Sequence, residues 1–262
     1  MSSFSDLRTR LASALVMAVV GLGAIWLGGL AFGALALVLA GLMGWELHRM
    51  LDPDAPEGRG GATGVVAVLL VTVFTFYQSG WIALAGMALG AAVMAWRMPR
   101  DKLIFGLYFT LILWAAHSLI VFRGSYGLLF VLWIVLIVIA SDVAGYFAGR
   151  VFGGQKFWPR FSPKKTWSGT VAGWVLAGLV GVGFMSTFNL SWGLIPISAL
   201  LAFAGQLGDI AESAIKRHVG VKDSSNLIPG HGGVLDRFDA MIAVSALALI
   251  LAYFGAFSGA QG

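Results

Sequence analysis

The chain opens with MSSFSDLRTRLASALVMAVVGLGAIWLGG, residues 1–29, in which a short basic segment precedes an apolar run. A secretory signal peptide has the same order of features. This stretch, however, lacks a convincing polar, small-residue cleavage region, and further hydrophobic segments follow it immediately. We therefore expect a retained first helix that crosses a membrane.

The composition of the rest of the chain agrees with this expectation. Of the 262 residues, 59% are hydrophobic and only 11% are charged, whereas an ordinary soluble domain has about 25% charged residues. The chain has no cysteine, so a disulfide framework, a thiolate metal site and a cysteine nucleophile are all excluded. These features predict an integral membrane protein.

Apolar segments of about 17 to 23 residues, which suffice to cross a hydrocarbon core of roughly 30 Å, occur nine times. They are residues 11–28, 30–47, 63–79, 81–97, 103–122, 126–148, 168–188, 192–213 and 239–258. The segments lack the alternation of barrel strands, and lipid cannot satisfy an open backbone. We therefore predict an all-α, polytopic membrane protein with about nine transmembrane helices.

The basic residues predict the orientation of these helices. If the N-terminus is inside, 16 of the 17 Lys and Arg residues fall on one side and only Arg123 falls on the other. Basic loops stay in the cytoplasm, so the N-terminus is expected inside and the C-terminus outside. The longer internal segments, about 48–62, 149–167 and 214–238, then predict a functional site on the cytoplasmic face.

The internal loop 149–167 carries five basic residues and no acid, and it ends in the stretch SPKKT, residues 162–166. The charge alone fits attraction to anionic lipid head groups, worth about 1 kcal/mol per basic residue. Ser162, Lys164 and Lys165 also offer donors just before a helix, where free backbone N–H groups favour an anion. Membrane-surface attraction and phosphate binding both remain open for this loop.

Acidic residues within or beside the apolar segments are informative, because a charge at the bilayer centre costs roughly 2.5–3.5 kcal/mol. These acids are Asp142, Asp209, Glu212 and Asp239. Each lies near the predicted internal end of its helix, so interfacial capping or pairing with Lys or Arg is the alternative to a functional role.

The spacing of the acids suggests a metal site. Asp209, Glu212 and Lys216 are spaced i, i+3 and i+7 and share one helical face. Asp236 and Asp239 share a face at the start of the last helix, where the helix dipole tolerates carboxylates. Carboxylates that converge from two helices suit Mg²⁺, which prefers one or two carboxylates completed by water and substrate phosphates.

A glycine-rich loop precedes this last helix. In LIPGHGGVLDRFDA, residues 227–240, the glycines around His231 allow a tight turn or a close approach to phosphate. An ordinary loop before a helix is the alternative, and a lone loop histidine is more often a packing residue than a catalyst.

Residues 213–239, SAIKRHVGVKDSSNLIPGHGGVLDRFD, resemble the C-terminal signature of phosphatidate cytidylyltransferases, the CDP-diacylglycerol synthases. The match runs through Ser213, Lys216, Arg217, Lys222, Asp223, Pro229, His231, Gly232, Gly233, Asp236, Arg237 and Asp239. The stretches SDVAGYFAGRVFGG (141–154) and FSPKKTWSG (161–169) are also similar to that family's central region. The resemblance implies one membrane-embedded catalytic domain over 1–262, with residues 1–100 mainly architectural and 101–262 carrying the active site.

The resemblance also implies roles for these residues in making CDP-diacylglycerol and pyrophosphate from CTP and phosphatidic acid. Asp209 and Asp236 would hold Mg²⁺, with a second cation as an option. The second choices for the metal are Asp239, Glu212 and Asp142. The expected catalytic residues are Lys216, Arg217, Lys222, His231 and Arg237, and the expected substrate-binding residues are Ser213, Asp223, Gly232, Gly233, Lys164, Lys165 and Ser162.

The expected partners are the two substrates and membrane lipids, without nucleic acid, and the resemblance is compatible with a homodimer. The expected location is the plasma (inner) membrane of a bacterium, with the site on the cytoplasmic side. A transporter or flippase is an alternative, because intramembrane acids also build ion pathways, but the polar residues here gather at one predicted face. A CDP-alcohol phosphotransferase is a second alternative, but the chain lacks the aspartate cluster expected of that family.

Overall fold

The computed structural model describes residues 2–77, 80–188, 190 and 192–258, and in this part of the chain it contains nine helices and one two-stranded sheet. The chain forms two compact units. Unit 1 comprises Met1–Gly124 and Lys216–Phe238, and unit 2 comprises Ser125–Ile215 and Asp239–Gly262. The chain passes between the units within helices α8 and α9, so both units contribute residues to these two helices.

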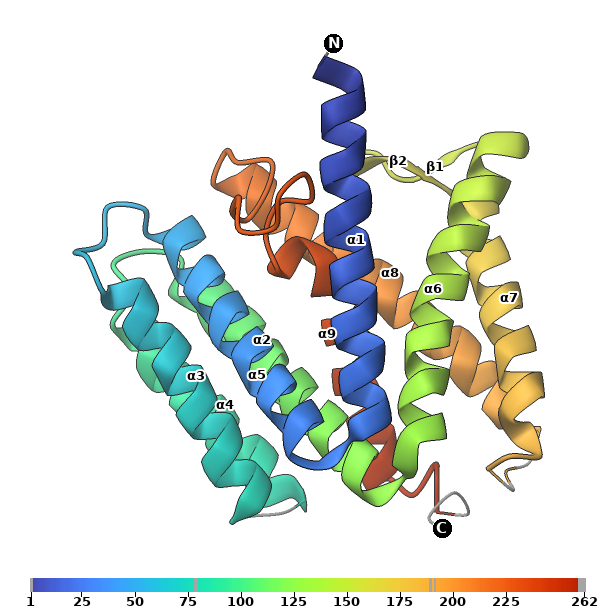
Figure 1. Ribbon diagram of the computed structural model, residues 1–262, viewed down its shortest axis with the longest axis horizontal. Helices are drawn as coiled ribbons and strands as arrows, with labels where there is room; N and C mark the ends of the chain where they lie inside the picture. The colour runs from blue at the N-terminus through green and yellow to red at the C-terminus, as the bar shows by residue number, and fades with distance from the viewer. Residues whose placement is uncertain (1, 78–79, 189, 191, 259–262) are drawn as a thin grey trace. The chain divides into compact units, whose positions relative to one another are not determined.

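Unit 1 is built on four packed helices. They are α2 (Gly29–Leu51), α3 (Arg59–Phe76), α4 (Gly80–Trp96) and α5 (Lys102–Ser125). Helix α2 packs against α3, and α3 packs against α4 (Figure 1). Helix α5 joins them through Trp114, whose indole N–H donates to the Leu84 carbonyl at 3.0 Å. Fully buried side chains such as Phe105 and Phe109 form the core.

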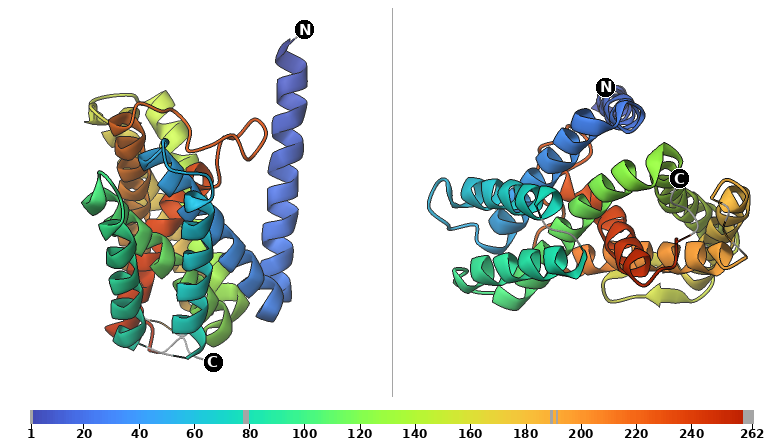
Figure 2. Two further views of the ribbon diagram at one scale, coloured as in Figure 1. Left: turned by 90° about the vertical axis from the view of Figure 1, so that its left-hand side faces the viewer. Right: turned by 90° about the horizontal axis from the view of Figure 1, so that it is seen from below.

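Helix α1 (Ser2–Leu27) is the least packed helix of unit 1 (Figure 2, left). Only 6% of its apolar segment is buried, against 44% for α2. At its C-terminal end, Arg123 Nε donates to the Ile25 carbonyl at 2.7 Å, and Arg123 Nη2 donates to the Trp26 carbonyl at 3.1 Å. The last carbonyls of a helix have no partner within the helix. Arg123, the one basic residue predicted outside, therefore caps α1.

We expect Arg123→Ala to lower the free energy of unfolding by about 1–2 kcal/mol, because two charge-assisted hydrogen bonds at a partly exposed site are lost. Thermal unfolding of the purified protein in detergent measures this loss. Arg123→Lys, which keeps the charge and a donor, should lose less. An unchanged melting temperature for Arg123→Ala would show that the cap does not contribute to stability.

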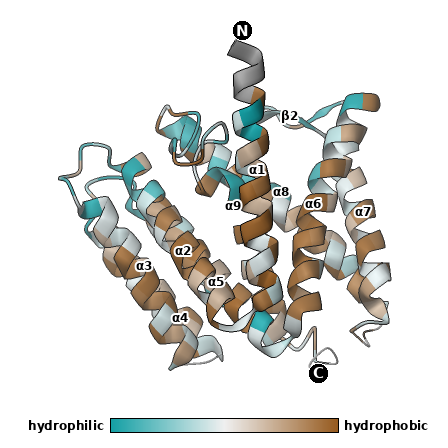
Figure 3. Ribbon diagram, in the orientation of Figure 1, coloured by the Kyte–Doolittle hydropathy of each residue, from teal (hydrophilic) through white to brown (hydrophobic). Residues whose placement is uncertain are grey.

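The polar connections of unit 1 gather at one end of its helices, as the teal segments at the α2–α3 turn and the loop before α9 illustrate (Figure 3). Arg100 Nη2 of the α4–α5 connection lies 3.7 Å from Asp54 Oδ2 of the α2–α3 connection. His218 Nε2, at the end of α8 (Leu194–His218), lies 2.9 Å from Asp101 Oδ1. Three connections that were all predicted to be internal thus meet within unit 1.

Unit 2 contains α6 (Gly127–Val151), α7 (Trp167–Met185), α8 up to Ile215 and α9 (Leu235–Tyr253) from Asp239 onward. Helices α6 and α7 approach closely where Gly145 faces Gly169, since a Cβ on Gly169 would stand 2.5 Å from the Gly145 carbonyl oxygen. Small residues are what allow such backbone contact between membrane helices. The aromatic core of the unit is Phe130, Trp133, Phe188 and Phe257.

A helix overlaps each of the nine predicted spans, although residues 78 and 79 of the third span lie outside the described residues. The helical fold class is thus confirmed. Within the described residues, seven helices are long and apolar enough to cross a membrane. Helix α4 has only 17 residues, and α9 begins with three charges among its first five residues. The count of nine spans and the orientation stay predictions.

One element was not predicted. Strands β1 (Lys156–Trp158) and β2 (Ser162–Thr166) form an antiparallel hairpin in what the sequence indicated was a loop. Gly153 and Gly154, both with positive φ, follow the end of α6, and the hairpin pairing satisfies backbone groups of the segment after them. Thr166 then serves as the N-cap of α7 and accepts the Gly169 N–H at 3.2 Å, the usual role of threonine at this position.

Candidate active site

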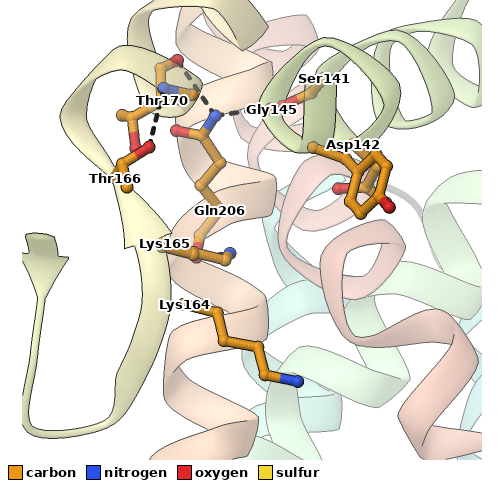
Figure 4. A pocket seen from close by; sticks show the side chains of 10 residues that line it. Ser141, Asp142, Gly145, Lys164, Lys165, Thr166, Thr170 and Gln206 are labelled. Atoms are coloured by element: carbon orange, nitrogen blue, oxygen red, sulfur yellow. Dashed lines mark hydrogen bonds between the residues drawn. The ribbon is translucent and has the colours of Figure 1, made fainter. Parts of the chain in front are cut away.

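A pocket of about 190 Å³ lies within unit 2, where α6, β2, α7 and α8 contribute side chains (Figure 4). It contains Asp142 of α6, both predicted lysines of β2, and Gln206 of α8. The lining residues are Ser141, Asp142, Gly145, Tyr146, Lys164, Lys165, Thr166, Gly169, Thr170 and Gln206. The hairpin thus brings the central basic motif beside one of the predicted intramembrane acids.

Lys165 links this pocket to Asp209. Its Nζ lies 2.5 Å from Asp209 Oδ2 and donates to the Gln206 carbonyl at 3.2 Å. Asp142 lies within electrostatic reach of both Lys165 and Asp209, and Ser213 Oγ donates to Asp209 Oδ1 at 3.4 Å. Lys165, Asp209 and Asp142 thus form one cluster of interacting charges.

Gln206 organises the wall of the pocket, and it was not among the predicted site residues. Its Nε2 donates to Ser141 Oγ and to the Thr170 carbonyl, both at 3.2 Å (Figure 4). Its Oε1 accepts the Trp174 indole N–H at 3.0 Å. Three helices are joined by this one amide. A polar amide in the middle of an otherwise apolar helix was the signal that could have identified it.

The signature loop, residues 219–234 between α8 and α9, belongs to unit 1 and folds around Asp236. Asp236 Oδ2 accepts the Ser224 N–H at 2.8 Å, the Ser224 hydroxyl at 2.9 Å and the Gly233 N–H at 2.8 Å. Its Oδ1 accepts Lys216 Nζ at 2.6 Å, and the two side chains are 2% and 14% exposed. Burial alone would raise the pKa of the Asp236 carboxyl, but these hydrogen bonds outweigh burial and lower it.

A second buried carboxylate, Glu46 of α2, holds the other side of the signature loop. Its Oε1 accepts the Ser225 hydroxyl at 2.6 Å and the Val234 N–H at 2.9 Å. Its Oε2 accepts the Leu235 N–H at 2.7 Å and the Ser224 hydroxyl at 3.3 Å. Glu46 is completely buried. A carboxylate from a distant helix therefore caps the N-terminus of α9, where the helix dipole favours negative charge.

Position 233, where the Glu46 carboxylate and the Ser224 hydroxyl meet, has room only for glycine. A Cβ at this position would stand 2.5 Å from Glu46 Oε1 and would overlap the Ser224 hydroxyl. Gly233 was predicted to leave room for phosphate. The structure gives it a different neighbour, because the space beside its Cα is filled by the carboxylate that holds the loop.

Most of the remaining signature residues line a polar pocket of about 520 Å³ in unit 1. Its predicted members are Lys222, Asp223, His231, Gly232 and Arg237. Arg217 lies in the last turn of α8, and Glu212 is completely buried in the same helix. Asp239 Oδ1 accepts the N–H of Ala240 at 2.7 Å, and Ser162 begins β2 opposite Trp158.

The two residues first predicted to hold Mg²⁺ lie in different units, Asp209 in unit 2 and Asp236 in unit 1. Among the described residues, no three His, Asp or Glu side chains form a metal-binding group. Asp142 lines the unit 2 pocket, and Asp209 pairs with Lys165 of the same lining. Mg²⁺ needs only one or two carboxylates when phosphates and water complete its shell, so Asp142 and Asp209 are the residues that would hold the ion. Both oxygens of Asp236 accept hydrogen bonds, as do both oxygens of Asp209, and the metal roles of both residues stay predictions.

Comparison with known proteins identifies the family. A family model described as "Cytidylyltransferase family" matches residues 8–254. The phosphatidate cytidylyltransferase of Brucella suis is 34% identical over 260 residues, covering 96% of this chain and 94% of the relative. That of Bacillus subtilis is 32% identical over 266 residues, covering 95% and 99%. That of Staphylococcus haemolyticus is 44% identical over 130 residues, covering 48% and 50%. The chain, with its basic hairpin and its signature loop held by two carboxylates, belongs to the cytidylyltransferase family.

Proposed function

We propose that the protein is a phosphatidate cytidylyltransferase, which transfers the cytidylyl group of CTP to phosphatidic acid and releases pyrophosphate. The observation that carries this proposal is the near full-length match to bacterial proteins of that name. Two pockets agree with it, since lysines and hydroxyl groups line the unit 2 pocket and cations of the signature line the unit 1 pocket, and both sets of groups suit phosphate. The same match disfavours a transporter or a CDP-alcohol phosphotransferase.

The reaction needs positioning and charge neutralisation more than acid–base catalysis. A phosphate oxygen of phosphatidic acid attacks the α-phosphorus of CTP, and the bond from that phosphorus to the β-phosphate oxygen breaks. The attacking phosphate is already an anion, so no strong general base is required. Lysine and arginine side chains neutralise the charge that gathers on the leaving pyrophosphate. Lys164 and Lys165 of the unit 2 pocket have the chemistry for this task. Lys222 and Arg237 line the unit 1 pocket, and Lys216 holds Asp236.

Magnesium is part of this proposal, with Asp209 and Asp142 as the ligands that the geometry favours. A bound Mg²⁺ would supply charge neutralisation at the phosphate oxygens. Lys165 pairs with the Asp209 carboxylate, so its ammonium group lies beside the proposed metal ligand, where it would also neutralise a substrate phosphate.

The proposed location is the bacterial plasma membrane, with the N-terminus and the site on the cytoplasmic side and the C-terminus outside. The asymmetry of the basic residues supports this orientation. The ion pairs that join the α4–α5 connection to the α2–α3 connection and to the end of α8 support it too, because all three segments are expected on that side. A homodimer stays a prediction.

The purified protein, given phosphatidic acid, CTP and Mg²⁺ in detergent micelles, should form lipid-soluble cytidine and an equal amount of pyrophosphate. Radiolabelled CTP measures the first product, and a coupled phosphate assay measures the second. Diacylglycerol, which lacks the attacking phosphate, is the matched control substrate and should give neither product. No labelled lipid with phosphatidic acid across varied detergents and divalent metals would contradict the proposed function.

A further inference from the structure

One residue that lines the polar pocket beside the signature loop comes from the first helix, far from the signature in the sequence. This pocket of about 520 Å³ is lined by Lys222 and Arg237 of the signature and also by Arg10 of α1. Asp223 is the one carboxylate among the lining residues. Three cations against one acid favour an anionic ligand, and arginine in particular suits phosphate oxygens because its guanidinium can donate two parallel hydrogen bonds.

Helix α1 is fastened to the signature loop at the position that brings Arg10 to this pocket. Ser13 Oγ donates to the Pro229 carbonyl at 2.9 Å. The Arg10 side chain lies against the next residue, since a Cβ on Gly230 would stand 2.7 Å from Arg10 Cγ. Figure 2 (left) shows the loop reaching from the rest of unit 1 to α1. An otherwise loosely packed helix therefore meets the signature loop beside the pocket.

His231 provides an independent indication that the pocket takes a ligand. It also lines the pocket, and within the described part of the chain its Nδ1 is buried without a hydrogen-bond partner. Buried polar atoms nearly always have a partner. An oxygen of a phosphate group, or a hydroxyl next to it, would satisfy this nitrogen.

The surface of α1 indicates which phosphate the pocket takes. Beyond Arg10 the helix presents large apolar side chains, with Leu11 61% exposed and Leu15 65% exposed. In a membrane protein such a surface contacts lipid tails. A lipid with its phosphate at Arg10 and its acyl chains along α1 would match both the cationic pocket and the apolar face of the helix. A nucleotide has no acyl chain to place along α1.

We propose that Arg10, together with Lys222 and Arg237, binds the phosphate monoester of the lipid substrate. This inference rests on the proposed function, in which that substrate is phosphatidic acid. It assigns a substrate-binding role to a residue of the first helix, whereas the sequence indicated only an architectural role for residues 1–100.

The test compares two arginines of the same helix. Arg10→Gln should raise the KM for phosphatidic acid, measured as its mole fraction in micelles at saturating CTP, by about tenfold, the effect of losing roughly one charged hydrogen bond. The KM for CTP should not change. Arg8→Gln is the matched control, because Arg8 is exposed, two residues away and outside the pocket, and it should behave as the unmodified protein. Arg10→Lys should recover part of the loss.

A second measurement does not depend on turnover. Dihexanoyl phosphatidic acid should raise the melting temperature of the unmodified protein and of Arg8→Gln, and it should raise that of Arg10→Gln less. Equal effects of Arg8→Gln and Arg10→Gln would overturn the inference in favour of general attraction to an anionic surface. A raised KM for CTP alone would overturn it in favour of a triphosphate site. An inactive unmodified protein would contradict the proposed function, while the melting shifts would still decide the role of Arg10.

Discussion

Asp209→Asn should reduce cytidylyl transfer by at least about a hundredfold, the usual effect of removing one charged group that stabilises a transition state. The change preserves the size of the side chain but removes the negative charge that Lys165 binds at 2.5 Å. It thereby removes one of the two carboxylates that we propose as ligands of Mg²⁺ beside the unit 2 pocket. The assay measures kcat at saturating CTP and phosphatidic acid over a range of Mg²⁺ concentrations.

The matched control for this substitution is Asp101→Asn, which makes the same chemical change at a carboxylate paired with His218 near the surface. Exposed pairs contribute little, so this variant should stay within about twofold of the unmodified activity. Mg²⁺ should raise the melting temperature of the unmodified protein but not of Asp209→Asn. Full activity of Asp209→Asn, with its Mg²⁺ response intact, would exclude Asp209 as a metal ligand.

The helices were predictable because each depends on a local property of the sequence. A run of some 17 to 25 apolar residues must be helical in lipid, whatever its neighbours are. The β1–β2 hairpin was not predictable in this way. Its strands have only three and five residues, and charged residues are as frequent in them as apolar ones. The strands pair across only residues 159–161, and neither strand is long enough to show the alternation by which a local pattern indicates a strand.

The candidate site was predictable only in part, for a related reason. Helical spacing predicted that Asp209, Glu212 and Lys216 share one face, and all three lie in the single helix α8. Spacing cannot indicate which other segment a face meets. It therefore did not show that Lys165 binds Asp209, or that Lys216 binds Asp236.

Glu46 is an acidic residue within a predicted transmembrane span, and it could have been selected as a candidate from the sequence. A carboxylate within the predicted span 30–47 has the same energetic cost as Asp142 or Asp209, so the same argument should have selected it. Its partners are the hydroxyls and N–H groups of a loop about 180 residues later in the chain. The cost of its burial could be read from the sequence, but the four hydrogen bonds that offset this cost could not.

The second large loss of activity is expected for Glu46→Gln. Each carboxylate oxygen of Glu46 accepts one backbone N–H, from Val234 at Oε1 and from Leu235 at Oε2. A glutamine amide has only one oxygen, so in either orientation its NH₂ group must face one of these N–H groups, and two donors cannot pair. Leaving a buried donor without an acceptor costs about 1–3 kcal/mol, and this cost falls on the start of α9, next to Asp236.

We expect Glu46→Gln to lower kcat by about a hundredfold, because a displacement of roughly 1 Å in positioned groups has this effect. Ser225→Ala is the matched control, since it removes one neutral donor to the same carboxylate and an exposed acceptor of the Leu227 N–H. It should change kcat by less than about threefold, close to the net value of a single hydrogen bond. Hydrogen exchange should be faster in Glu46→Gln at residues 233–235 and unchanged in the α6–α7 pair of unit 2. If Glu46→Gln kept full activity and normal exchange at these residues, the signature loop would be held by Asp236 alone. If exchange rose throughout both units, Glu46 would support the stability of the whole fold and not the position of the loop.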